Sequence, residues 1–148
     1  MKVLLDNKLL WEPSRKVEES EKFLAITNCM KMIDLAEENN GIGLTAVQVG
    51  ISKAYFVAEL KGSFHIVINP KIVNYGKNKL IGKEGCLSFP GMPQGNIERF
   101  RKIKVEFTNE RDELVTMKLT KLDAIVFQHE YDHTCGVVCV DRYIVGGK

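Results

Sequence analysis

The sequence predicts an α+β fold in which antiparallel strands pack around one buried helix, with residues 1–148 forming a single domain. Two kinds of segment lead to this prediction. Short runs rich in β-branched and aromatic residues lie between turn residues, as in antiparallel sheets. Near the C-terminus an apolar stretch at helical spacing leads into a polar segment, which indicates a helix packed inside the domain.

The N-terminal part is expected to hold an extended arm followed by a helix. Pro13 disfavours a helix in residues 1 to about 17, and Asn39-Asn40-Gly41 is a helix stop. Between these points the spacing predicts a helix over Ser20–Asn40. Its apolar face is predicted to consist of Phe23, Ile26, Met30 and Ile33.

Most of the remaining chain is predicted to form strands. Residues 102–107 alternate strictly between charged and apolar side chains, which is typical of a half-buried strand. Residues 109–112 favour a turn, so the next strand is expected to return as the second arm of a hairpin. The predicted strands are residues 54–58, 65–68, 71–75, 80–86, 102–107, 114–117 and 137–140.

The segment Gln128-His129-Glu130-Tyr131-Asp132-His133 lies in a helix predicted to begin at Thr120 and to end near Gly136. Thr120 is a good N-cap residue, and Asp123 occupies the third position of a capping box. This helix is expected to be buried nearly all round. One of its faces is predicted to carry Leu122, Ile125, Val126, His129 and His133.

Composition excludes several classes of function. The formal net charge is +2 and no basic face stands out, so nothing indicates binding to nucleic acid or to an anionic membrane. No apolar run approaches the length of a membrane span, and Asp6 interrupts the apolar start too early for a signal peptide. The protein is therefore expected in the cytoplasm with reduced cysteines.

The two histidines of the motif are four residues apart, so on a helix they share one face and can bind one metal ion. Glu130 follows His129 and can reach a metal-bound water as a base without being a ligand. A single histidine on an apolar face is usually a core residue, but three polar groups in one buried helix need partners. The motif therefore predicts a metal site with a general base.

The third ligand must come from elsewhere in the chain. Cys86 lies in an extended segment with flanking glycines that can approach a metal. A thiolate with two histidines leaves one position open, as in catalytic sites. From spacing alone, Glu84 is an equally good candidate. Packing roles or positions away from the metal are predicted for Cys29, Cys135 and Cys139.

The loop Gly41-Ile42-Gly43 leads to Gln48, whose role is open at this point. A dinucleotide site is rejected, because a helix precedes the loop and Ala46 takes the place of a third glycine. The Gln48 amide either makes an ordinary loop hydrogen bond or donates to a developing oxyanion.

Three stretches, in this order, resemble the peptide deformylase family: Gly41 to Gln48, Glu84 to Ser88 and Gln128 to His133. Asn69-Pro70 also agrees with the family pattern. The resemblance implies the fold of that family and metal-dependent removal of the formyl group from N-formylmethionyl peptides, with release of formate. The alternative is a general H-E-x-x-H metallopeptidase.

The resemblance also implies individual roles. Glu130 is expected to act as general base and then as proton donor, while Gln48 and the backbone N–H of Leu87 polarise the formyl carbonyl. The implied cofactor is one divalent ion, Fe²⁺ in the cell and replaceable by Zn²⁺, Ni²⁺ or Co²⁺, with water in the fourth position. Its implied ligands are Cys86, His129 and His133.

The implied substrate is an extended peptide that pairs with the backbone around Gly43 and contacts Gly85. It is the end of a formylated nascent chain, so the implied partners include the ribosome, and the protein is expected to act as a monomer. A pocket for the methionine side chain is implied for Ile42, Glu84, Leu122, Ile125, Val126 and His129.

Three positions depart from the family pattern. Thr134 stands where leucine is usual after the second histidine, which removes apolar packing behind the metal. Thr45 stands where alanine is usual, which adds a hydroxyl to a tight loop. Asn40 stands where many members carry a carboxylate that supports a metal-binding histidine, so this support is expected to be built differently.

Overall fold

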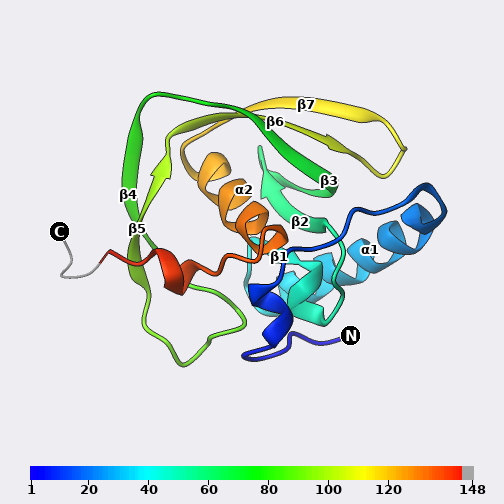
Figure 1. Cartoon of the computed structure of the whole chain (residues 1–148), viewed down its shortest axis with the longest axis horizontal. Coiled ribbons are helices and arrows are strands. Elements are labelled where there is room, and N and C mark those ends of the chain that lie inside the picture. Colours follow the sequence, from blue (N-terminus) through cyan, green and yellow to red (C-terminus); the bar gives the residue numbers. More distant parts are fainter. Residues whose placement is uncertain (145–148) are drawn as a thin grey trace.

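The computed structural model describes residues 1–144, which form a mixed α/β structure with two antiparallel sheets (Figure 1). The predicted α+β class is confirmed. The strands are β1 (Gly43–Thr45), β2 (Tyr55–Leu60), β3 (Ser63–Tyr75), β4 (Lys79–Glu84), β5 (Gly95–Phe100), β6 (Lys102–Thr108) and β7 (Leu114–Thr120). The helices are α1 (Lys22–Glu38) and α2 (Lys121–Thr134), and the 3-10 turns are η1 (Lys8–Trp11), η2 (Glu19–Glu21), η3 (Ala46–Val49) and η4 (Cys139–Arg142).

The larger sheet has the order β1-β2-β3-β6-β7, and the smaller sheet pairs β4 with β5. All of these pairs are antiparallel, and β6 and β7 form the predicted hairpin. Strand β1 pairs with β2 alone among the described residues, so one of its edges is left without a strand. Strand β1 also packs close to α2 (Figure 1).

The two helices cover opposite faces of the larger sheet at β2. Side chains alternate along a strand, so Tyr55 and Val57 pack with α1 while Phe56 and Ala58 pack with α2. Phe56 meets Phe127 of α2 edge to face, with ring centroids 5.1 Å apart. Helix α2 is thereby enclosed between the sheet and the β4–β5 ribbon. No helix within residues 1–144 is long and apolar enough to cross a bilayer.

Helix α1 lies where a helix was predicted, but its apolar face was predicted only in part: Ile26 and Ile33 pack against the core as expected, whereas Phe23 and Met30 do not. Phe23 and Met30 are 83% and 61% exposed. The face that meets the sheet is instead lined by smaller side chains, so the helix can approach the sheet closely. Its buried residues are Ala25, Cys29, Met32 and Ala36, which includes the packing role expected for Cys29.

Three strand predictions were wrong in detail. The segments 65–68 and 71–75 belong to one strand, β3, because the chain passes Asn69-Pro70 by a register shift against β6. Strand β5 was not predicted, because its adjacent charged residues Glu98 and Arg99 interrupt any apolar alternation. Residues 137–140 form no strand, and the chain there enters η4 after a left-handed Gly136 with φ 78°.

The start of α2 also differs from the prediction. Thr120 precedes the helix as expected, but its side chain makes no capping hydrogen bond. Lys121 adopts φ 53°, so the backbone enters the helix along an unusual path, and the Asp123 carboxylate accepts from the backbone of Lys61 instead. Leu122 in the first turn is 60% exposed, so only the later turns are enclosed.

Candidate active site

A cavity of about 430 Å³ opens between α2, β1 and the segment after β4. Every site residue expected from the sequence lines this cavity except His133, which is completely buried beneath it. Leu122 lies at the exposed first turn of α2, while Gln48 and Glu130 are buried. The remaining expected residues in the lining are Ile42, Gly43, Glu84, Gly85, Cys86, Leu87, Ile125, Val126 and His129.

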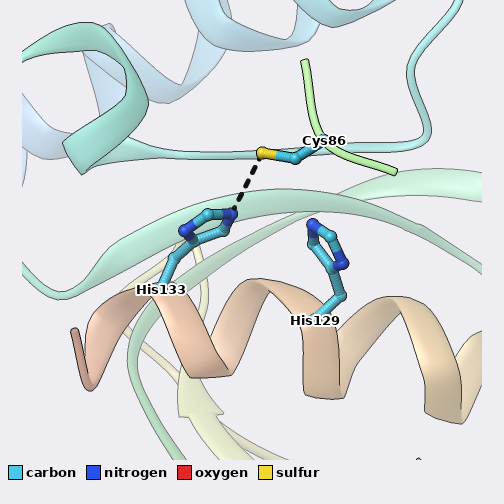
Figure 2. A group of neighbouring side chains, drawn as sticks. All are labelled: Cys86, His129 and His133. Carbon is cyan, nitrogen blue, oxygen red and sulfur yellow. Dashed lines mark hydrogen bonds between the residues drawn. The ribbon is translucent and has the colours of Figure 1, made fainter. Parts of the chain in front are cut away.

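Cys86, His129 and His133 converge on one point (Figure 2). The two imidazoles project from successive turns of α2 toward the sulfur of Cys86, which lies across from them just after β4. One ligand atom from each residue lies within 4.8 Å of the other two, and the Cys86 sulfur is 3.6 Å from Nε2 of His133. A soft sulfur with two imidazoles suits a transition metal and leaves further coordination positions for other ligands.

The second nitrogen of His129 is already occupied by Glu84. Nδ1 lies 2.9 Å from Oε1 of that carboxylate, so the ring presents Nε2 toward Cys86 and His133. Burial disfavours a charged imidazole, but the Glu130 and Glu84 carboxylates outweigh it and raise the pKa of His129 to about 9. Glu84 therefore supports His129. In many family members a carboxylate at the position of Asn40 is expected to support a histidine in this way, and here Glu84 does so.

Arg99 holds Glu84 in place. Its guanidinium donates twice to the carboxylate, at 2.9 Å each, and once to Asp132 at 2.5 Å. Burial opposes ionisation of Glu84, yet the hydrogen bonds from His129 and Arg99 lower its pKa to about 2. Asp132 also accepts from Arg142, so an ion-pair chain runs from the metal ligands to the surface.

The protonation of the imidazoles also bears on metal binding. Burial lowers the pKa of His133 well below its ordinary value, which favours the neutral ring that a metal ion requires, whereas His129 would have to lose a proton on binding. Within residues 1–144 the buried Nδ1 of His133 has no hydrogen-bond partner, and its Nε2 is the nitrogen that faces Cys86. Contact with the Cys139 thiol, together with burial, raises the pKa of Cys86, so metal binding would release a proton there.

Glu130 is directed from α2 toward β1. Its Oε1 accepts a hydrogen bond of 2.7 Å from the Thr45 hydroxyl, a group that departs from the family pattern. Its Oε2 lies so close to Gly43 that a Cβ there would come within 2.6 Å. Burial raises the pKa of Glu130, despite the opposing effects of His129 and the Thr45 hydrogen bond. A carboxylate whose pKa is raised in this way is a stronger proton acceptor than an ordinary glutamate.

Gln48 faces Cys86 from η3. Its Oε1 accepts from the backbone N–H of Thr45 at 2.9 Å, and its Nε2 donates to the Cys86 sulfur at 3.3 Å and to Ser88 at 3.4 Å. The backbone N–H of Thr45 can only donate, so the amide oxygen must face it and the NH₂ group must face Cys86. Gln48 is thus oriented as a donor into the cavity.

Three contacts were not anticipated from the sequence. The hydrogen bond from Thr45 to Glu130 joins residues that are 85 positions apart, so no local sequence pattern predicts it. Cys139, expected in the core, is buried but also touches the Cys86 thiol. The ion pairs of Arg99 could have been expected in part from the sequence, since a charged residue at an inward position of a strand needs a buried partner of opposite charge.

Comparisons with known proteins agree with this geometry. Residues 3–146 match the family model described as polypeptide deformylase. The peptide deformylase of Aquifex aeolicus (strain VF5) is 39% identical over 147 residues, covering 95% of this chain and 85% of that protein. The crystal structure of peptide deformylase from Thermotoga maritima superposes with a TM-score of 0.90 at 35% identity, covering 97% of both chains. A probable peptide deformylase from synechococcus phage S-SSM7 gives 0.88 at 35% identity, covering 97% of this chain and 99% of its own. The chain therefore belongs to the polypeptide deformylase family.

Proposed function

We propose that this chain is a metal-dependent hydrolase that removes the formyl group from N-formylmethionyl peptides and releases formate. One observation carries the proposal: three potential metal ligands lie within 4.8 Å of one another, and Glu130 and Gln48 face the same cavity. We assign the whole of residues 1–148 to one catalytic domain, of which residues 145–148 lie outside the described part.

The proposed metal ligands are Cys86, His129 and His133, and the proposed native ion is Fe²⁺, with Zn²⁺, Ni²⁺ or Co²⁺ as substitutes. A divalent cation in this set supplies Lewis-acid chemistry, which makes water reactive near neutral pH and polarises a carbonyl. Glu84 keeps His129 in the required orientation, since its carboxylate binds Nδ1.

Glu130 is the proposed proton carrier. It accepts a proton from water as the water oxygen bonds to the formyl carbon. When the carbon–nitrogen bond breaks, Glu130 returns the proton to the amine nitrogen, so the products are formate and a free peptide N-terminus. Meanwhile the Gln48 amide and the backbone N–H of Leu87 donate to the formyl oxygen as it gains negative charge.

The free edge of β1 is the proposed place of the peptide backbone, because an extended peptide can add there as a further strand. Gly43 permits the close approach, since any side chain at this position would collide with Glu130. Gly85 contacts the peptide on the opposite side. The methionine side chain is proposed to fill the pocket lined by Ile42, Glu84, Leu122, Ile125, Val126 and His129.

The proposed setting is the cytoplasm, where the protein acts as a monomer on nascent chains as they leave the ribosome. Such chains carry the formyl group on their first residue. An open cavity that the extended N-terminal segment of the chain can enter therefore suits this substrate.

A substrate comparison tests the proposal. The protein is purified without oxygen, its metal is quantified, and it is incubated with formyl-Met-Ala and with longer peptides whose N-termini carry an acetyl group. Formate release from formyl-Met-Ala with the acetylated peptides intact is the expected result. Internal cleavage of the longer peptides without formate release would instead identify a general metallopeptidase.

A further inference from the structure

The carboxylate of Glu130 has two oxygens in different surroundings. Oε1 accepts from the Thr45 hydroxyl at 2.7 Å, whereas Oε2 lies 3.9 Å from Nε2 of His129, the ring nitrogen turned toward the ligand cluster. The hydrogen bonds of residues 1–144 leave Oε2 without a donor. One oxygen is thus anchored, and the other is free on the side of the proposed chemistry.

The anchor is rigid because Thr45 is itself held on all sides. The residue is completely buried in β1, paired with Phe56 of β2. Its hydroxyl also lies 3.3 Å from the backbone carbonyl of Glu130, so it contacts both the main chain and the side chain of that residue. A β-branched side chain in a strand has few rotamers to lose, so the hydroxyl is held in place at small entropic cost.

Thr45 also orients the second polar group of the cavity. Its backbone N–H binds Oε1 of Gln48 at 2.9 Å, and Thr45 and Gln48 form a capping box around η3. The Gln48 NH₂ group is therefore turned toward Cys86. One residue thus holds both side chains, Glu130 through its hydroxyl and Gln48 through its backbone.

We propose that Thr45 is a positioning residue for the reaction: its hydroxyl anchors Oε1 of Glu130, so that Oε2 faces the ligand cluster. This inference rests on the proposed role of Glu130 as the proton carrier. The hydroxyl contributes through the geometry of Glu130, because it does not touch the bond that breaks. An alanine at this position keeps the hydrogen bond from its backbone N–H to the Gln48 side chain, but it loses the anchor on Glu130 and the side-chain half of the capping box.

The test compares Thr45→Ala, Thr45→Ser and Thr45→Val in formate release from formyl-Met-Ala. Small displacements of a reacting group cost large factors in rate, so kcat of T45A and T45V is expected to fall on the order of tenfold or more. KM is expected to stay within about twofold, because the peptide contacts of β1 are backbone contacts. T45S restores the hydroxyl and is expected to recover most of the lost kcat.

Two readouts do not depend on turnover. Metal content is expected to match the wild type in all three variants, because Thr45 touches none of the proposed ligands. Crystal structures are expected to show the Glu130 carboxylate displaced in T45V and in its wild-type position in T45S. Thr134→Ala is the matched control, because it also removes a buried hydroxyl near the motif, but one whose contacts are the carbonyl of Tyr131 and the Cys135 sulfur.

The outcomes separate this inference from the proposed function. An active wild type with an unchanged kcat in T45A would overturn the role of Thr45 alone. So would a loss of metal in T45A, or a T45S variant as slow as T45A, since each indicates a role in packing. A metal-loaded wild type that releases no formate would overturn the proposed function, and the inference with it.

Discussion

At the residue scale, the proposed roles are of two kinds: some groups hold a metal ion and one group moves a proton. Cys86 belongs to the first kind. It is the sole proposed ligand outside α2, and its sulfur lies 3.6 Å from His133. Its loss leaves two imidazoles on one helix, which is an incomplete site for a tightly held ion.

Cys86→Ser is therefore expected to lower the metal content of the purified protein by at least about tenfold, since a hydroxyl is a poor ligand for a soft transition metal. Metal analysis after dialysis measures the effect. Cys135→Ser is the matched control, because Cys135 is exposed and outside the ligand cluster, and it should retain the metal. Full metal and full activity in C86S would rule out the proposed ligand set.

Glu130 belongs to the second kind. Glu130→Gln keeps the shape of the side chain and can still accept from the Thr45 hydroxyl through its amide oxygen, but it cannot take up a proton. The expected result is a loss of formate release on the order of a hundredfold to ten-thousandfold, with normal metal content. A rate near that of the wild type would show that another group carries the proton.

At the element scale, β5 matters because it carries Arg99. The guanidinium is 4% exposed and binds two carboxylates: Glu84, which contacts His129, and Asp132, which belongs to the motif itself. Removing one member of a buried ion-pair network leaves uncompensated buried charge, which is costly.

Arg99→Met is expected to lower the free energy of unfolding by roughly 3–5 kcal/mol. Urea unfolding of the metal-free protein gives this value without any contribution from a bound ion. The matched control is Arg101→Met, two residues along the chain and exposed, for which a change within about 0.5 kcal/mol is expected. Equal effects in both variants would mean that the network contributes nothing specific.

Helix α2 and the β6–β7 hairpin were predictable because their signals are local: spacing, turn residues and alternation. Strand β5 was missed because Arg99 stands at an inward position, and only its partners, 15 and 33 residues away, explain a charge there. The face of α1 was predicted only in part, because periodicity favours large apolar residues, whereas the sheet accepts Ala25 and Ala36 at close range. Contacts of this kind depend on residues far apart in the chain, so they cannot be predicted from one segment of the sequence.

The same distinction applies to the candidate site. The histidine pair and Glu130 follow from helical periodicity alone, but spacing left Cys86 and Glu84 as equal candidates for the third ligand. In three dimensions they differ, since Glu84 binds the far nitrogen of His129 while Cys86 faces the cluster. The Thr45 contact depends on β1 packing against α2, which no sequence pattern encodes.

At the scale of the whole molecule, the proposed ligands join two parts of the chain. Cys86 follows the small β4–β5 sheet, while both histidines belong to α2, which packs on the large sheet. A metal ion held by this set would therefore cross-link the two sheets through the core. It would bind the folded chain far better than the unfolded one, and ligands of that kind stabilise the fold by mass action.

Removal of the metal is accordingly expected to lower the melting temperature by roughly 5–10 °C, given about 3 kcal/mol from an ion at a hundred times its Kd and a chain of this size. Calorimetry before and after treatment with a chelator measures the shift, and added Zn²⁺ or Ni²⁺ should reverse it. In C86S the chelator should have little effect, because the link between the two sheets is already lost. E130Q is the complementary case: it retains all three ligands, so its chelator-induced shift should equal that of the wild type although it releases almost no formate. A shift that persisted in C86S would place the stabilising metal at a different site.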